Sequence, residues 1–526
     1  MRNFLSRFRS LVLFILSGFD RLRLCGESRL LNHSGGVQSY LWQQNILFKD
    51  FPSHAKGLTN TLCQQTKSLA RQQGVPLQYL NSPDIDKEAV ARQLAQASGQ
   101  RLGRIAVLSC LESCSIYKIR KNADGLIFPN KELSRCLHYY HYFQHERFGL
   151  CCVRIQSWFP FSIRIGLNGR RWLCRQLEQR GVSFRQDDNL LLDVADPVLA
   201  QTLLDDQCHT DWPSVLQELV QPIHPLWDHL YHTAQVPYYW MVEQSEWATD
   251  VMFRSRADRD LWYDRWIRHG IINLRCQDTL HFFGKTVQGN QESKISLRTR
   301  TEGRRLKFWY GANSEKMYDK GRQAVETPSS SPSGPAAVRF ENTMNDPSMF
   351  KVFRTKEGEE DDAPKSWQQL RKGVADLPRR AEIGQAANNR LMESMATVAE
   401  TTPLGKLLEP LCQPTRDHKG RRVRALNPSA GPDGQLLRHI AHGDFLLNGF
   451  RNRDLRLLLH KPTEDKQEQR RQSAALTRRL AILKAHGLII KVPKTHRYQL
   501  SAAGKRLTTA LSAAYEADVT RLTQAG

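Results

Sequence analysis

The sequence predicts a multidomain α+β protein, and three observations support this fold class. The chain has 526 residues, and at roughly 100 to 200 residues per domain this length corresponds to about three or four domains. With 40% hydrophobic and 9% aromatic residues, the chain holds enough apolar side chains to build packed cores. Runs of strand-like residues are followed by groups of amphipathic helices, which is the pattern of an α+β fold.

The N-terminal region, residues 1–103, is predicted to be mixed α/β. Apolar residues 11–16 follow a basic segment, and we expect a buried N-terminal helix there. Export or membrane anchoring is the alternative, but the run is too short to span a bilayer and the charged Asp20 follows it. The elements expected next are a strand at 22–24 and helices at 61–73 and 86–99.

Residues 104–209 are predicted to form a ferredoxin-like α+β region. Short apolar or alternating runs bounded by turn residues indicate strands, and two amphipathic stretches indicate helices. The expected strands are 105–108, 117–120, 136–143, 150–161, 163–165 and 190–194, and the expected helices are 172–179 and 197–206.

The middle region, residues 210–400, is predicted to be mainly helical, with its tryptophans packed in the core. The strands expected within it are a hairpin at 305–310 and 314–320 and a further strand at 338–342. The segment 327–337 consists almost entirely of Ser, Pro, Gly and Ala. We therefore expect it to be a disordered insertion that is dispensable for folding.

The last part of the chain carries about half of the basic excess. The whole sequence has 76 Lys plus Arg and 53 Asp plus Glu, a net charge of +23. Residues 421–526 alone have 20 Lys plus Arg and 8 Asp plus Glu, a net charge of +12. Such a charge implies a polyanionic partner, most simply nucleic acid. A Pro- and Gly-rich linker, 401–434, is expected to precede this domain, 435–526.

The order of elements expected in residues 435–526 is helix, helix, β-hairpin, helix. The helices are expected at 454–459, at 467–486 and from Ser501, and the strands at 488–492 and 496–500, with Gly487 ending the second helix. This is the order of a winged helix-turn-helix. Residues 476–480, 486–489 and 497–500, with Gly504, resemble the recognition helix, wing and closing helix of MarR-like and ArsR-like regulators, within residues 445–515.

The second of these helices has the two faces that a recognition helix needs. At 100° per residue, Leu476, Leu480 and Leu483 form a buried stripe, and arginines lie on the far side. Arginine can bind guanine in the major groove, threonine can contact a thymine methyl, and the hairpin can meet phosphate. We expect double-stranded DNA as the partner; RNA, or a purely structural basic helix, is the alternative. The candidate residues are Arg470, Arg471, Thr477, Arg478, Lys491, Lys494, His496 and Arg497.

Two short motifs upstream carry a second resemblance. Residues 316–320 followed by 339–341 resemble the YDK and R-x-E strand pair of phage and plasmid replication initiators. With 156–161 and 246–250, they are similar to a family of bacterial proteins associated with mobile elements. Rolling-circle initiators hold a divalent metal with two histidines one residue apart. The histidines of this chain are spaced by three and four residues instead: His138, His141 and His145.

Carboxylates in the middle region could hold Mg²⁺ for metal-dependent phosphodiester chemistry. Glu243, Glu246 and Asp250 would lie on one face if their segment were helical, and three like charges together favour a bound cation. Asp319 and Glu341, on neighbouring strands, could complete a catalytic site. The alternative is that these carboxylates are surface groups paired with the abundant arginines.

A second cluster has ligand types that suit zinc. The 11 cysteines are an odd number at low density, which is typical of reduced thiols in a cytoplasmic protein. Cys110 and Cys114, followed by Cys136 and His138, could form a tetrahedral site, with the last two on one face of a strand. Free buried cysteines are the alternative.

Two functions remain open from the sequence. No Walker loop, dinucleotide-binding glycine pattern, nucleophile elbow or HExxH motif occurs, so the corresponding enzyme classes have no support. The first hypothesis is a DNA-processing protein of a mobile element, in which residues 1–400 act on nucleic acid. The second is a non-enzymatic winged-helix regulator whose N-terminal region binds a partner or ligand. The length of the chain favours the first hypothesis. The sequence contains no run of eighteen apolar residues, so a membrane is not expected as a partner.

Overall fold

The computed structural model confirms the predicted α+β class, because helices and strands are both abundant. The chain divides into two compact units, each assembled from segments that are distant in the sequence. Unit 1 comprises Met1–Ile15, Thr249–Asn342 and Gln385–Gly526, and unit 2 comprises Leu16–Ala248 and Thr343–Gly384. The structure describes residues 2–97, 99, 102–234, 238–274, 282–284, 293–300, 303–320, 336–356, 364–397, 403–417, 419–441, 445, 449–460, 463–492 and 495–516.

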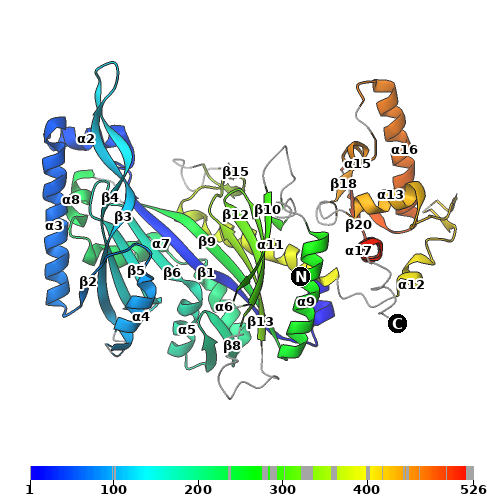
Figure 1. Cartoon of the computed structure of the whole chain (residues 1–526), viewed down its shortest axis with the longest axis horizontal. Helices are drawn as coiled ribbons and strands as arrows, with labels where there is room; N and C mark the ends of the chain where they lie inside the picture. Colours follow the sequence, from blue (N-terminus) through cyan, green and yellow to red (C-terminus); the bar gives the residue numbers. More distant parts are fainter. Residues whose placement is uncertain are drawn as a thin grey trace. The chain divides into compact units, whose positions relative to one another are not determined.

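Unit 2 is built around a mixed β-sheet with helices packed against it (Figure 1). The strands lie in the order β1 (Val12–Ser28), β6 (Ile163–Asn168), β5 (Gly149–Gln156), β4 (Ile127–His145), β3 (Gly103–Lys121) and β2 (Leu77–Leu80). Strands β3 to β6 form an antiparallel meander, β1 pairs antiparallel with β6, and β2 is parallel to β3.

Seven α-helices and two small hairpins accompany this sheet among the described residues of unit 2 up to residue 369. The helices are α2 (Ser34–Gln43), α3 (Phe51–Gln72), α4 (Lys87–Ala97), α5 (Gly169–Gln179), α6 (Pro197–Gln207), α7 (Trp212–Val220) and α8 (Trp227–Ala234). The hairpin strands are β7 (Phe184–Asp187) with β8 (Leu190–Val194), and β14 (Lys351–Arg354) with β15 (Ser366–Gln369). Helices expected at 61–73, 86–99, 172–179 and 197–206 are therefore present.

The β3–β4 hairpin extends past its neighbours in the sheet (Figure 1). β3 and β4 pair along almost their whole length, from Gly103 with Gln144 to Lys121 with Ile127. On one side, β2 pairs with β3 only as far as Cys110, and on the other β5 pairs with β4 only from His138 onward. Residues 111–137 therefore form a two-stranded projection, which we call the β3–β4 arm. The strands predicted at 105–108 and 117–120 are parts of one strand.

Unit 1 contains the strands predicted around residues 305–342. Its strands lie in the order β10 (Ser293–Arg300), β11 (Gly303–Tyr310), β12 (Asn313–Lys320), β13 (Ala336–Met344) and β9 (Tyr238–Phe253), whose last residues belong to this unit. The helices that accompany them are α1 (Arg2–Phe8), α9 (Arg256–Asn273) and the end of α11 (Leu377–Ala396). Phe4 and Phe8 of α1 pack against Trp266 of α9, with ring centroids 5.5 and 5.2 Å apart.

Residues 12–16 begin strand β1, so the predicted N-terminal helix at 11–16 is wrong. A short continuous apolar run fits a buried strand and a buried helix equally well. The strand forms because the apolar pattern continues through Leu22 and Leu24, both fully buried, along one 17-residue strand. Among the described residues, no helix combines the length and the apolar character needed to cross a membrane.

The middle region contains more strand than the sequence predicts. Residues 238–253 form β9 instead of a helix. Nearly all of its last residues are buried, and a strand buried on both faces lacks the polar alternation that marks an exposed strand. Ala336 and Ala337 are fully buried in β13, so the end of the predicted insertion 327–337 is part of the sheet. The rest of that insertion lies outside the described residues.

The C-terminal part of unit 1 has the predicted order of elements. After α12 (Leu404–Leu408) and the short strands β16 (Thr415–Arg416) and β17 (Arg422–Val423) come α13 (Gly431–Ile440), β18 (Phe450–Arg451), α15 (Asn452–Leu459), α16 (Lys466–Ala485), β19 (Ile489–Lys491), β20 (Arg497–Leu500) and α17 (Ala502–Glu516). Gly487 follows α16 with φ of +72°, the left-handed conformation expected of it. The apolar side chains of this segment, from Leu411 to Leu511, form one core cluster.

We expect Gly504→Ala to lower the unfolding free energy of this C-terminal segment by about 1 to 3 kcal/mol. A Cβ atom on Gly504 would lie 2.0 Å from the backbone oxygen of Leu488, so α17 would have to move away from β19. Gly405→Ala is the matched control, because a Cβ there meets nothing within 4 Å. The stability of each variant can be measured by hydrogen exchange of residues 449–516 at increasing urea concentrations. Equal stability of the two variants would contradict this account.

Candidate functional site

The candidate nucleic-acid-binding residues lie on helix α16 and on the hairpin that follows it. Leu476, Leu480 and Leu483 are buried, which confirms the predicted apolar stripe. The exposed candidates are Arg470, Arg471, Thr477 and Arg478 on α16 and Lys491 and His496 on the hairpin. We call Arg470, Arg471, Arg478, Lys491 and His496 the basic surface.

Two of the candidate side chains, Thr477 and Arg497, form hydrogen bonds within the fold, and a third candidate lies outside the described residues. The Thr477 hydroxyl donates to Ser473 O and accepts from Asn452 Nδ2, both at 2.9 Å, so its hydrogen-bonding capacity is largely used within the fold. Arg497 is half-buried and donates from Nη1 to Gly449 O at 3.3 Å, which gives it a structural role. Lys494 lies outside the described residues.

The carboxylates predicted to share a helical face lie on strand β9 instead. Alternate residues of a strand point to opposite faces, so Glu243 faces away from Glu246 and Asp250. Glu243 Oε1 lies 2.9 Å from Nε of Arg164 on strand β6. The predicted three-carboxylate face is therefore wrong, because it depended on a helix at 238–253.

Two of the predicted catalytic carboxylates are paired with buried arginines. Arg339 donates to both oxygens of Asp250, with distances of 2.5 and 2.9 Å, and both side chains are almost fully buried. Asp319 Oδ2 lies 3.7 Å from Nη1 of the buried Arg259. Pairing with arginine, the alternative that the sequence left open, thus describes these two groups, although they are buried rather than on the surface.

Glu341 joins the two upstream motifs. Lys316 Nζ donates to Glu341 Oε1, and Tyr318 donates from its hydroxyl to Oε2 at 2.5 Å. Burial disfavours the charged carboxylate, but the charges of Lys316 and Arg339 outweigh it and lower the pKa of Glu341 to about 2. The YDK-like and R-x-E-like segments are therefore adjacent strands whose charged residues neutralise one another.

Glu315 is a buried carboxyl that the sequence analysis missed. Asn342 Nδ2 donates to its Oε2 at 2.9 Å. Burial, together with the nearby Glu341, raises the pKa of Glu315 from 4.5 to about 8, although Asn342 and Lys316 act in the opposite direction. Glu315 lies two residues before Met317 on β12, and residues two apart on a strand point to the same face. This shared face with an apolar residue is the sequence signal that could have indicated burial.

Unit 2 brings Glu246 close to a second carboxylate, Asp20. Each offers an oxygen, and these oxygens lie within 4.8 Å of one another. Asp20 is buried, and both of its oxygens accept from Asn189 Nδ2, at 2.7 and 2.9 Å. Asp20 was missed because it was interpreted only as the charge that ends an apolar run. Two neighbouring carboxylates are an arrangement that a divalent cation can stabilise.

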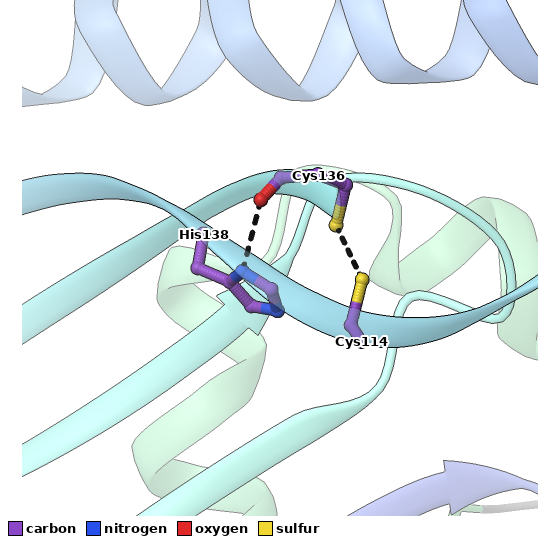
Figure 2. A group of neighbouring side chains, drawn as sticks. All are labelled: Cys114, Cys136 and His138. Carbon is purple, nitrogen blue, oxygen red and sulfur yellow. Dashed lines mark hydrogen bonds between the residues drawn. The ribbon is translucent and has the colours of Figure 1, made fainter. Parts of the chain in front are cut away.

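Three of the four predicted zinc ligands lie together at the base of the β3–β4 arm. Figure 2 shows Cys114, Cys136 and His138, whose ligand atoms all lie within 4.8 Å of one another. The two sulfur atoms are 3.0 Å apart, and His138 Nδ1 lies 3.2 Å from Cys136 O. Cys110 does not belong to this group. It packs in an apolar cluster with Leu80, Leu108 and two tyrosines.

An arginine paired with a glutamate borders this cluster. Arg154, which the sequence analysis did not single out, donates from Nη2 to His138 Nε2 at 2.9 Å, and its Nη1 lies 3.4 Å from Glu112 Oε2. The hydrogen bond with Cys136 lowers the pKa of the Cys114 thiol to about 5 against the effect of burial, and His138 adds to this lowering. The same hydrogen bond, with burial, raises the pKa of Cys136.

The other two histidines of the predicted series take no part in this cluster. His141 is fully buried, and burial lowers its pKa well below 6.5. His145 Nδ1 accepts from Arg147 N at 3.0 Å, within the turn that follows β4.

Comparison with known proteins gives one structural match. No protein-family model and no curated protein matches the chain. A solved structure described as that of a rolling circle replication initiator protein from Geobacillus stearothermophilus aligns with 45% of this chain and 78% of its own, with 11% identity and a TM-score of 0.16. A TM-score this low does not establish a shared fold.

Proposed function

We propose that the chain binds nucleic acid, specifically double-stranded DNA, through a winged-helix module at residues 435–526, and that it takes part in DNA processing for a mobile element. The observation that carries this proposal is the basic surface. Three arginines of α16 are exposed on the side away from the buried Leu476, Leu480 and Leu483. The side chains that would enter a major groove therefore do not hold the core together.

The chemistry of the basic surface suits a duplex. Arg471 and Arg478 lie near the centre of the exposed face, and arginine can bind guanine O6 and N7 through two hydrogen bonds. Lys491 and His496 are exposed on the hairpin, and their cationic or hydrogen-bonding side chains would meet phosphates beside the groove. Glu468, whose Oε2 lies 3.3 Å from Arg471 Nε, is an exchangeable surface partner that phosphate or a base can replace. The mobile-element part of the proposal rests on the motif resemblance at 316–320 and 339–341.

We expect Arg471→Ala combined with Arg478→Ala to weaken specific DNA binding by about 1 to 3 kcal/mol for each lost two-bond base contact. The affinity can be measured by fluorescence anisotropy of labelled duplexes mixed with the full chain. The duplexes are first obtained by selection from a randomised pool, and binding is measured over a series of salt concentrations. Arg180→Ala is the matched control, because this exposed arginine lies on unit 2 and its guanidinium donates to the neighbouring Gln176. Absence of binding at low salt, or equal affinity of both variants, would refute the proposal.

A second candidate function is metal-dependent phosphodiester chemistry with Mg²⁺, and the proximity of Asp20 and Glu246 favours it. Hard carboxylate oxygens are the ligands that Mg²⁺ takes in nucleotide-processing enzymes. Cleavage or joining of single-stranded, duplex or branched DNA that needs Mg²⁺ or Mn²⁺ and is lost in Glu246→Gln would support it. DNA binding without any such activity would instead favour the non-enzymatic regulator.

A further inference from the structure

We propose that Cys114, Cys136 and His138 form a binding site for Zn²⁺ at the base of the β3–β4 arm. The site lies where the arm leaves the sheet: β5 begins to pair with β4 at His138, and β2 stops pairing with β3 at Cys110. Two thiolates and an imidazole are ligands that zinc prefers. A metal held by both strands would fix the arm at its point of departure.

The two cysteines are free thiols whose sulfur atoms are close enough to share a metal. Cys114 lies opposite Ser134 and Cys136 lies opposite Glu112, so the two cysteines are diagonal neighbours on adjacent strands. Both cysteines are free, and their sulfur atoms lie 3.0 Å apart, well beyond the S–S bond length of about 2.05 Å. Two Zn–S bonds of about 2.3 Å at a tetrahedral angle hold sulfurs about 3.8 Å apart, so zinc binding would separate the two sulfurs by about 0.8 Å more than the observed 3.0 Å.

The orientation of His138 is that of a metal ligand. Its Nδ1 lies 3.2 Å from the backbone oxygen of Cys136, so the proton on Nδ1 is donated there and Nε2 is left with a lone pair. Metal-bound histidines are commonly fixed in this way by a second hydrogen bond from the other ring nitrogen. Figure 2 shows the His138 ring with Nδ1 directed toward Cys136 O.

Arg154 now occupies the position that the metal would take at Nε2. It donates to His138 Nε2 at 2.9 Å, and it also contacts Glu112 at 3.4 Å. When zinc binds, Arg154 retains Glu112 as its partner, and the two thiolates balance the charge of the ion. The three protein ligands leave a fourth coordination position for water.

The test uses the full chain, freed of metal by a chelator, with Zn²⁺ and with Co²⁺ as a spectroscopic probe. We expect one tightly bound ion per chain and thiolate-to-cobalt absorption. Cys114→Ser and His138→Gln should each weaken binding by more than about tenfold. Cys110→Ser is the matched control, because Cys110 is a buried cysteine directly opposite His138 on the same hairpin, and it should bind as the wild type does.

Alkylation mapping of the wild-type chain decides the question even if the variants do not fold. Zn²⁺ should protect Cys114 and Cys136 from alkylation under partly denaturing conditions and leave Cys110 unprotected. The proposal is overturned if the wild type takes up no ion, if Cys114→Ser binds zinc as tightly as the wild type, or if protection is the same for all three cysteines. These readouts are independent of DNA binding.

Discussion

Replacing Arg339 by Met should strongly destabilise unit 1. Arg339 is fully buried and donates two hydrogen bonds to Asp250, and its charge also acts on Glu341. Removing one member of a buried ion pair leaves the other charge without compensation, which costs about 3 to 5 kcal/mol. We expect a correspondingly lower unfolding free energy in urea at pH 7.

The matched comparison separates burial from charge pairing. Arg120→Ala removes an arginine that pairs with Glu132 on the exposed β3–β4 arm. Exposed ion pairs contribute little to the free energy of unfolding. The double variant Arg339→Met with Asp250→Leu should recover much of the lost stability, because no unpaired charge remains. A single Arg339→Met variant as stable as Arg120→Ala would show that Asp250 is compensated in another way.

Glu315→Gln should raise stability at pH 8 and leave it nearly unchanged at pH 5. The pKa of Glu315 is about 8 in the folded chain against an ordinary 4.5, so between these values the folded state holds a proton that the unfolded state has released. Stability therefore falls as pH rises through this window and levels off above it. At about 1.4 kcal/mol per pKa unit, the full loss is about 5 kcal/mol, and glutamine removes it while keeping an oxygen for Asn342.

The measurement is urea unfolding of wild type and variant from pH 5 to pH 9. Glu382→Gln is the control, since Glu382 is an exposed carboxylate paired with Arg379 on the surface of α11, and its curve should parallel that of the wild type. Parallel curves for wild type and Glu315→Gln would mean that Glu315 is ionised in the fold at neutral pH.

The features that the sequence predicts well are those that local periodicity determines. The leucine stripe of α16, the left-handed Gly487 and the hairpin of β11 and β12 each depend on residues within a few positions of one another. Strand β9 was misassigned because its last seven residues, 247–253, are buried on both faces, so no alternation of polar and apolar residues there distinguishes the strand from a buried helix.

The partners of the candidate site residues could not be predicted in the same way. The sequence offers many arginines near Asp250, yet the one that binds it is Arg339, 89 positions away. Such pairing depends on which strands are neighbours and in what register, and neither is encoded locally. By contrast, Cys136 and His138 could be placed on one face of a strand from their spacing alone, whereas the approach of Cys114 depended on the register of β3.

The division of unit 1 among three separate stretches of sequence sets the time at which it can fold during synthesis. Asn3 N in helix α1 donates to Glu393 Oε1, across 390 residues, so the first helix has no complete docking site until α11 has been made. At about 5 to 20 residues per second, that delay lasts roughly 20 to 80 s. During this interval Phe4 and Phe8 lack their full native environment on the nascent chain, and a chaperone that shields short apolar helices has its main opportunity to bind there.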